Sequence, residues 1–176
     1  PRTSSAASDV YKRQIIRSDL VSSNALTASH DININDIDIG VSDSATAASK
    51  AIAINAVASS TNVTASGDNL VTLTINYSEA SSVGSNISIN GNTINFSSVT
   101  NATGAITAIN NASIGDIIAS ANSEGDLELA SASGADITIA QSGTLGVFNE
   151  GYVDITGATI SLASSHTFKG QLLLTH

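Results

Sequence analysis

The densest group of oxygen-bearing side chains lies at residues 31–40, DININDIDIG. Asp31, Asn33 and Asn35 match the first three ligand positions of an EF-hand calcium loop, which begins D-x-N-x-N. Asp36, however, stands where that loop requires Gly, and Ser42 stands where it requires a bidentate Glu. The intervening isoleucines alternate with polar residues, as in a strand with one buried face. The sequence therefore predicts a β-hairpin with acids on its solvent face in place of a metal site.

No other group of residues has the spacing of a known catalytic or cofactor site. His30, His166 and His176 are scattered and form no i,i+4 pair for zinc. Asp126 and Glu128 share one face of an expected strand, as a glycosidase pair could, but no aromatic platform accompanies them to hold a sugar. The chain has no Cys, no G-x-S-x-G and no Gly-rich phosphate loop with Lys. We therefore expect a non-enzymatic protein with no cofactor and no metal.

The beginning of the chain does not resemble the rest of it. Residues 4–14, SSAASDVYKRQ, look like a translated sequencing-library adapter, so residues 1–14 are treated as a non-native artefact and excluded from the prediction. The chain contains no Met, and it stops at QLLLTH within an apolar run. Both features predict an internal fragment of a longer reading frame.

The charge of the chain excludes two classes of partner. The 176 residues carry a formal net charge of −9. Without residues 1–14 the basic residues fall from 6 to 3 and the acidic residues from 15 to 14, so the net charge becomes −11. A surface this acidic repels phosphate backbones and anionic lipids. We therefore expect neither nucleic acid nor a membrane surface as a partner.

The sequence repeats itself at an offset of 55 residues. An internal repeat of this length indicates two copies of one supersecondary unit. The register slips by one residue near the end of the repeat, and a small insertion follows in the second copy. The matching stretches are 32–39 with 87–94, 53–55 with 108–110, 63–66 with 117–120, and Leu70 with Leu127.

Each copy should fold as a hairpin, a helix and two further strands. The second hairpin, ISINGNTINF, places Gly91-Asn92 at a tight turn, and the first hairpin turns at Asp36 and its neighbours. Ser44 is a plausible cap for the first helix. The helices are expected within 45–60 and 102–113, and the strand pairs at 63–66 with 70–77 and at 117–121 with 127–130.

These elements predict an α+β fold of two tandem small β-β-α-β-β units, with mixed or antiparallel sheets that each carry one short helix. The first domain should cover 31–80, and the second should cover 81–176 with a β-rich extension beyond 134. Residues 15–30 are a linker or a strand of a preceding module. Asn55 and Asn110, which follow the apolar helix positions, are expected to bond to backbone in the turn that leads to the third strand.

The order of these short motifs resembles the flagellin hook IN motif of bacterial flagellins. That motif has I-N-G on a strand, A-I-N at the end of a helix, then a V-x-A-S strand and a G-x-L-x-L strand. The first copy departs from it at Asp36, where the motif prefers Gly. The resemblance covers roughly residues 31–176, and the positions that carry it as structural motif residues are Asn35, Asn55, Asn90, Gly91 and Asn110.

The resemblance implies a structural, non-catalytic outer domain of a flagellar filament subunit, extracellular and serving motility. Its partners would be other flagellin subunits, bound through long terminal helices that this fragment lacks, and exposed Ser and Thr could carry O-glycans. Such a fragment should fold without assembling filaments by itself. The alternative is a filament-cap or adhesin-type surface domain that binds a glycan or host receptor through loops. The flanking sequence would distinguish the two.

Overall fold

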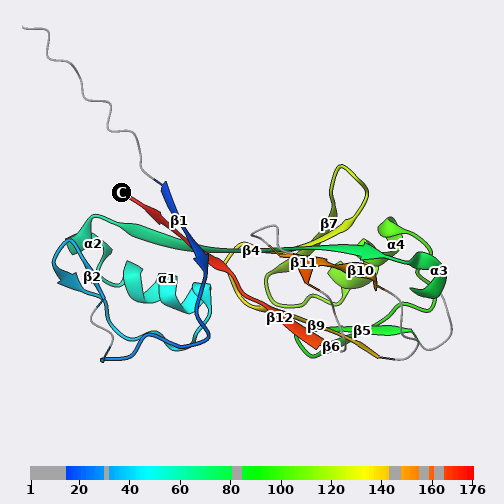
Figure 1. The fold of residues 1–176 in the computed structure, drawn as a ribbon, viewed down its shortest axis with the longest axis horizontal. Coiled ribbons are helices and arrows are strands. Elements are labelled where there is room, and N and C mark those ends of the chain that lie inside the picture. Colours follow the sequence, from blue (N-terminus) through cyan, green and yellow to red (C-terminus); the bar gives the residue numbers. More distant parts are fainter. Residues whose placement is uncertain (1–14, 30–31, 81–84, 143–147, 155–158, 161–164) are drawn as a thin grey trace, which may run out of the picture.

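The computed structural model describes residues 15–29, 32–80, 85–142, 148–154, 159–160 and 165–176 (Figure 1). It has the predicted α+β class, and every strand pair in it is antiparallel. The helices are α1 (Ala47–Asn55), α2 (Ala58–Thr61), α3 (Tyr77–Ala80) and α4 (Ala102–Asn111). The strands are β1 (Ile15–Leu20), β2 (Asn33–Ile34), β3 (Ile37–Asp38), β4 (Thr64–Ile75), β5 (Asn86–Ile89), β6 (Asn92–Asn95), β7 (Ile117–Ala121), β8 (Leu127–Ser131), β9 (Ile137–Ser142), β10 (Phe148–Val153), β11 (Thr159–Ile160), β12 (Ser165–Phe168) and β13 (Gln171–Thr175).

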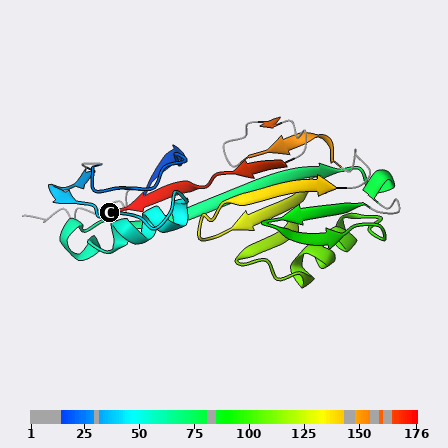
Figure 2. The ribbon, with the colours of Figure 1, turned by 90° about the horizontal axis from the view of Figure 1, so that it is seen from below.

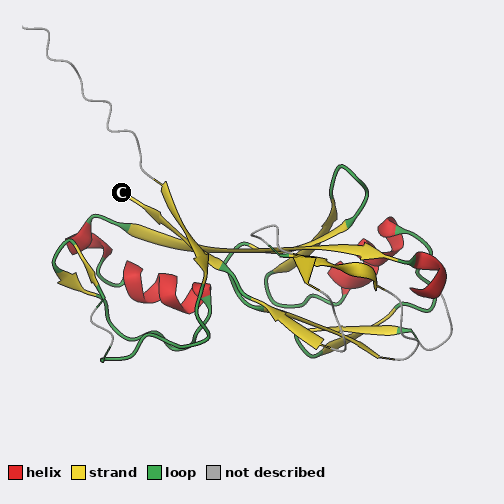
Figure 3. Cartoon of the chain, viewed as in Figure 1, coloured by secondary structure: helices red, strands yellow, loops and turns green. Residues whose placement is uncertain are grey.

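The elements form two lobes that lie end to end along the long axis, and β4 runs through both (Figures 1 and 3). We define the first lobe as residues 15–68 and 171–176, and the second lobe as residues 69–170. In the first lobe β13 pairs with β1 and with residues 64–68 of β4. In the second lobe β8 pairs with residues 69–73 of β4 and also with β7. The second lobe is therefore an insertion between two parts of the first.

Strand β4 keeps one face buried from Ala65 to Leu73. Buried residues alternate there with exposed or partly exposed ones, because successive side chains of a strand point to opposite faces. Ala65 contributes to the first core, whereas Val71 and Leu73 contribute to the second. Gly67 and Asn69 are the buried positions between them. One pleated strand thus supplies both cores with side chains from the same face.

The first lobe has a small core of Ile39, Ala51, Ala53, Ile54 and Ala65, with further apolar side chains partly buried around it. Its helix α1 begins after Thr46, whose hydroxyl accepts a hydrogen bond from the Ser49 amide at 3.2 Å. The prediction that Ser44 caps this helix was wrong, since Ser44 Oγ instead bonds to the hydroxyls of Thr46 and Ser49. The helix also ends earlier than expected, and α2 follows as a separate turn.

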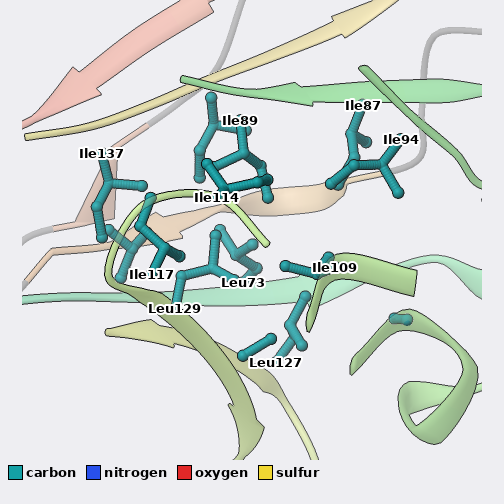
Figure 4. Close-up of a cluster of buried hydrophobic side chains, with 14 of the residues drawn as sticks. Leu73, Ile87, Ile89, Ile94, Ile109, Ile114, Ile117, Leu127, Leu129 and Ile137 are labelled. Atoms are coloured by element: carbon teal, nitrogen blue, oxygen red, sulfur yellow. The ribbon is translucent and has the colours of Figure 1, made fainter. Parts of the chain in front are cut away.

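The second lobe has a larger core, in which two sheets and a helix face one another (Figures 2 and 4). The four-stranded sheet β12-β9-β5-β6 supplies Ile87, Ile89 and Ile139, which are fully buried. Leu73 and the leucines of β8 pack from the opposite sheet, and Ile109 packs from α4. The other core members are Val71, Ile94, Phe96, Val99, Ala105, Ile114, Ile117, Ala119, Leu127, Leu129, Ile137 and Phe168.

Three chain segments lie close together where the lobes join, and we call this place the waist. Residues 67–69 and 168–171 pass from one lobe to the other, and residues 132–136 connect β8 to β9 within the second lobe. Asn69 is fully buried there, and its Nδ2 donates to the carbonyl oxygens of Ala135 at 2.9 Å and Phe168 at 3.0 Å. One side chain thus joins β4 to both other segments. Next to it, Lys169 Nζ and Asp136 Oδ2 form an ion pair at 2.5 Å.

Glycines allow the backbones at the waist to approach closely. A Cβ atom on Gly67 would lie 2.0 Å from the Ser133 carbonyl oxygen, and one on Gly170 would lie 2.7 Å from the Gly134 oxygen. Real Cβ atoms do not reach such distances from backbone atoms, so a larger residue would have to push the segments apart. Gly134 also has a φ of +77°, which L side chains rarely adopt.

The structure differs from the sequence prediction in how the first repeat ends. Two strands were expected at 63–66 and 70–77, but β4 is one continuous strand, and Tyr77 begins α3. The second repeat does form the expected hairpin of β7 and β8. The predicted division between residues 80 and 81 also assigns β13 to the second domain, whereas β13 pairs within the first lobe. The first 14 residues lie outside the described part.

Gly67→Ala should destabilise the protein by about 1–3 kcal/mol, the usual cost of forcing extra volume into a packed site. The loss should appear in urea unfolding followed by circular dichroism. Gly40→Ala is the matched control, because a Cβ at Gly40 meets no atom within 4 Å and its φ is not positive. Equal stability of the two variants would contradict the close crossing at the waist.

Candidate functional site

The motif asparagines in the last turns of the two helices make the same backbone contacts in both repeats. Asn110 Nδ2 donates to the Ala119 carbonyl at 3.0 Å, and the Ala119 amide donates to Asn110 Oδ1 at 2.8 Å. Asn55 bonds to Ala65 in the same way, at 2.8 Å and 2.7 Å. We call each of these double contacts an Asn clasp. The expected backbone partner is present in both, but it lies within β7 or β4 instead of in the preceding turn.

An Asn clasp works because a side-chain amide carries the same donor and acceptor as a peptide group. Ala119 lies on β7, which in the described chain pairs only with β8. Without Asn110, the outward-pointing N–H and C=O of Ala119 would have no strand beside them. Buried backbone groups need hydrogen-bond partners. Asn110 therefore fastens the end of α4 to the edge of the sheet beside the core.

A buried isoleucine precedes the asparagine of each Asn clasp in the sequence. Ile109 and Ile54 precede the two asparagines and are 1% and 6% exposed. Each isoleucine is part of its lobe's core, so the helix is held against the sheet by apolar contact on one side and by the amide on the other. The Ile-Asn pair is thus a single packing unit in each repeat.

The other two motif asparagines lie at the hairpin turns. Asn35 and Asp36 have φ values of 51° and 63°, and Asn90 and Gly91 have values of 47° and 81°. Two consecutive positive φ values are typical of a type I′ turn. The turn predicted at Gly91-Asn92 was one residue too late, because Asn92 already pairs with Ile89 in the ladder. Asp36 occupies the position of Gly91, and Asp tolerates the left-handed region better than most residues.

The two turn asparagines have different partners. Asn90 Nδ2 donates to the Asp136 carbonyl at 3.0 Å, and Asn90 Oδ1 accepts from the Thr138 amide at 2.7 Å. It therefore extends the pairing of β5 with β9 beyond the end of the strand. Asn35 Nδ2 instead donates to the Thr61 carbonyl at 2.8 Å and anchors the first hairpin to the end of α2.

The stretch that suggested calcium forms a hairpin of two short strands in its described part. Ile39 is buried, whereas Ile32 is 39% exposed, so the alternating isoleucines do not all face the core. Asp31 lies outside the described residues. Among the residues described, no group of three or more His, Asp or Glu side chains is arranged to hold a metal ion.

The remaining candidate residues are dispersed. His166 packs edge-on against Phe168 with ring centroids 4.7 Å apart, and His176 lies by Asn62, whose Nδ2 is 3.4 Å from Nε2. His30 is outside the described residues. Asp126 accepts a hydrogen bond from Thr74 Oγ1 at 3.2 Å. The structure therefore brings together the asparagine sites and their backbone partners, and leaves these titratable groups apart.

One buried lysine was missed by the sequence reasoning. Lys50 is 5% exposed, and its Nζ donates to the carbonyl oxygen of Ser22 at 3.0 Å and to its hydroxyl at 3.1 Å. Burial lowers the pKa of Lys50, the charge of Lys169 lowers it further, and Asp136 opposes both. Lys50 falls three residues after Ala47 and four before Ile54, so helical periodicity places it on the buried face.

The sequence reasoning also missed Asp116, whose carboxylate binds the end of β8 and the loop that follows it. Its Oδ2 accepts from Ser131 Oγ at 2.8 Å and from the Ser133 amide at 3.0 Å. Burial alone would raise the pKa of this carboxyl, but the hydrogen bonds from Ser133 and Ser131 outweigh that effect and lower the pKa. The ionised form is therefore the one that the fold stabilises.

The sequence was compared with family models and with curated proteins. No family model matches the chain, and no curated protein matches it. The resemblance to the flagellin motif therefore depends on the two sets of motif residues alone. In the described part of the chain, no helix has the length and apolar character needed to cross a membrane.

Asn110→Ala should destabilise the second lobe by about 1–3 kcal/mol, because it leaves the N–H and C=O of Ala119 without the partner they have now. Thermal unfolding followed by circular dichroism measures this loss. Asn111→Ala is the control, since this exposed neighbour is on the same helix and Ala favours helix more than Asn does. If both variants melt alike, Asn110 does not support the edge strand.

Asp116→Asn should cost about 1 kcal/mol at neutral pH, because charged acceptors make stronger hydrogen bonds and solvent weakens those at a partly exposed site. A lowered pKa in the folded state means that the stabilisation is complete above the ordinary pKa of 3.8 and is lost as pH falls through the folded value. Urea unfolding at several pH values should show the variant and the wild type converging in acid. A pH-independent difference would contradict the assignment.

Proposed function

We propose that this chain is a non-catalytic outer domain of a bacterial flagellar filament subunit, displayed to the medium and serving motility. The observation that carries the proposal is the repeated Asn clasp. The same motif asparagine, preceded by the same buried isoleucine, binds the backbone of the equivalent Ala in both repeats. The asparagines that resemble the flagellin motif therefore make the same contacts in both repeats, in addition to matching the motif in sequence.

The arrangement of the two lobes supports this proposal. Ile15 pairs with Thr175, so the chain enters and leaves the first lobe side by side. The second lobe lies beyond the waist, at the far end of the long axis (Figure 1). A unit attached through two adjacent segments can extend from the body of a larger protein without interrupting it. An outer domain of a filament subunit needs this kind of attachment.

The composition of the chain also suits an inert surface. Most of its described acids and amides are exposed or partly exposed, with Asn69, Asp154 and Gln171 as buried exceptions. A formal net charge of −9 favours solubility and disfavours nonspecific association. Exposed Ser and Thr offer hydroxyls to which O-glycans could be attached. On this proposal the partners are other flagellin subunits, bound through terminal helices outside this sequence, and the chain itself performs no catalysis.

The reading frame on both sides of this sequence tests the proposal most directly. A filament subunit requires long amphipathic helices with heptad-like apolar spacing at both termini of the full protein. Their presence on both sides is the expected result. Flanking frames without such helices would exclude a filament subunit and would favour the filament-cap or adhesin-type alternative, which a glycan-binding screen would then examine.

A chimera gives a second test that does not need the native gene. Residues 15–176 would replace the outer domain of a well-characterised flagellin, and filaments would be viewed by electron microscopy with antibodies against the inserted chain. We expect filaments that bind the antibody along their whole length, and no filaments from residues 15–176 alone. Filament loss in the chimera, with the inserted domain folded, would contradict the proposal.

A further inference from the structure

The first lobe leaves one edge of its sheet open. Among the described strands, β1 pairs only with β13, and all six of its residues are exposed. Ile15, Ile16 and Leu20 are 61%, 55% and 37% exposed, although they are large apolar side chains. An unpaired apolar edge is a template on which another strand can pair.

Two depressions lie beside this strand. One of about 280 Å³ is lined by Ile16, Ile34 and Leu174, with polar groups at its margin. The other, of about 330 Å³, is lined by Leu20, Leu172 and residues of the loop that follows β1. Both offer apolar walls to a side chain from a partner strand. Among the described residues, the exposed large apolar side chains lie in the first lobe with the single exception of Ile118 on β7.

The charges on β1 allow a second copy of this chain to approach there. Two copies repel each other over most of their surface, because each carries a formal net charge of −9. Strand β1 is locally neutral, since it holds Arg17 and Asp19 and no other charge. Of the other basic residues after position 14, Lys50 is buried and Lys169 is paired with Asp136. Repulsion between copies is therefore reduced at β1.

We propose that β1 pairs antiparallel with β1 of a second copy to form a two-fold dimer. An alignment centred on Ser18 puts Arg17 of each copy opposite Asp19 of the other, and Ile16 opposite Leu20. The bonds of Arg17 to Asp68 and Gln171 both use Nη1, so other N–H groups of the guanidinium remain for Asp19. Asp19 has no ion-pair partner among the described residues.

The dimer should be weak and should stop at two copies. A register shift between Arg17 and Leu20 interrupts the strand near the centre of the alignment and limits the length of the new ladder. The same patch on both copies makes a closed, isologous contact, which cannot continue into a fibre. This inference goes beyond the proposed function and does not rest on it, because filament assembly was assigned to segments outside this sequence.

Sedimentation equilibrium of the purified full chain tests the proposal. We expect a reversible monomer–dimer equilibrium with a Kd between about 10 μM and 1 mM, the range of a small interface. Ile16→Glu should raise Kd at least about tenfold, because it puts a charge into the pairing surface. Ile118→Glu is the matched control, since Ile118 is also an exposed strand residue, at 61%, but lies on β7 of the second lobe.

A charge exchange tests the alignment itself. Arg17→Asp and Asp19→Arg should each weaken self-association, because like charges then face each other across the two-fold axis. An equimolar mixture of the two variants should associate more tightly than either alone, since every facing pair is again of opposite sign. Circular dichroism would confirm that each variant is folded. A wild-type chain that is monomeric over the whole range, or equal effects of Ile16→Glu and Ile118→Glu, would overturn the proposal.

Discussion

The alternation of β4 is the constraint on which both lobes depend. Ala65 on one half of the strand and Leu73 on the other point to the same side, so the face that receives α1 continues into the face that receives the second core. A shift of register by one residue would turn both sets of side chains outward. Asn69 lies between the two halves and binds the other two segments of the waist, which fixes the position of β4 along its own axis.

The Asn clasps stabilise two helices that are too short to be stable alone. Neither α1 nor α4 is long enough to be stable by itself, because isolated helices of this length are marginal in water. Each is held by burial of an isoleucine and by an amide that binds both polar groups of one strand residue. In the first repeat that residue is Ala65 on β4, and in the second it is Ala119 on β7. The same local unit therefore serves both lobes, although β4 continues from one lobe into the other whereas β7 turns back and pairs with β8.

The different paths of β4 and β7 show which parts of the fold the sequence could predict. Local periodicity located α4, β7 and β8 within a residue or two, because their contacts lie close in sequence. It could not place β13 against β4, since nothing near Gln171 specifies a partner as distant as Asp68. One signal was available: the first repeat has three residues between Ser66 and Leu70, whereas the second has six between Ser120 and Leu127. The shorter connection lacks the turn that β7 and β8 share.

The candidate site was predictable to the same degree and for the same reason. Asn55 and Asn110 were found because both their motif and their partner strand lie in one repeat, but Asn69 binds carbonyls from segments that only the full fold brings together. The insertion also favours one order of assembly, in which the second lobe folds first. Residues 69–170 contain every strand and helix of the second core, whereas the first lobe requires Gln171 to meet Asp68. A folded second lobe brings those two residues close and so lowers the entropy cost of completing the first.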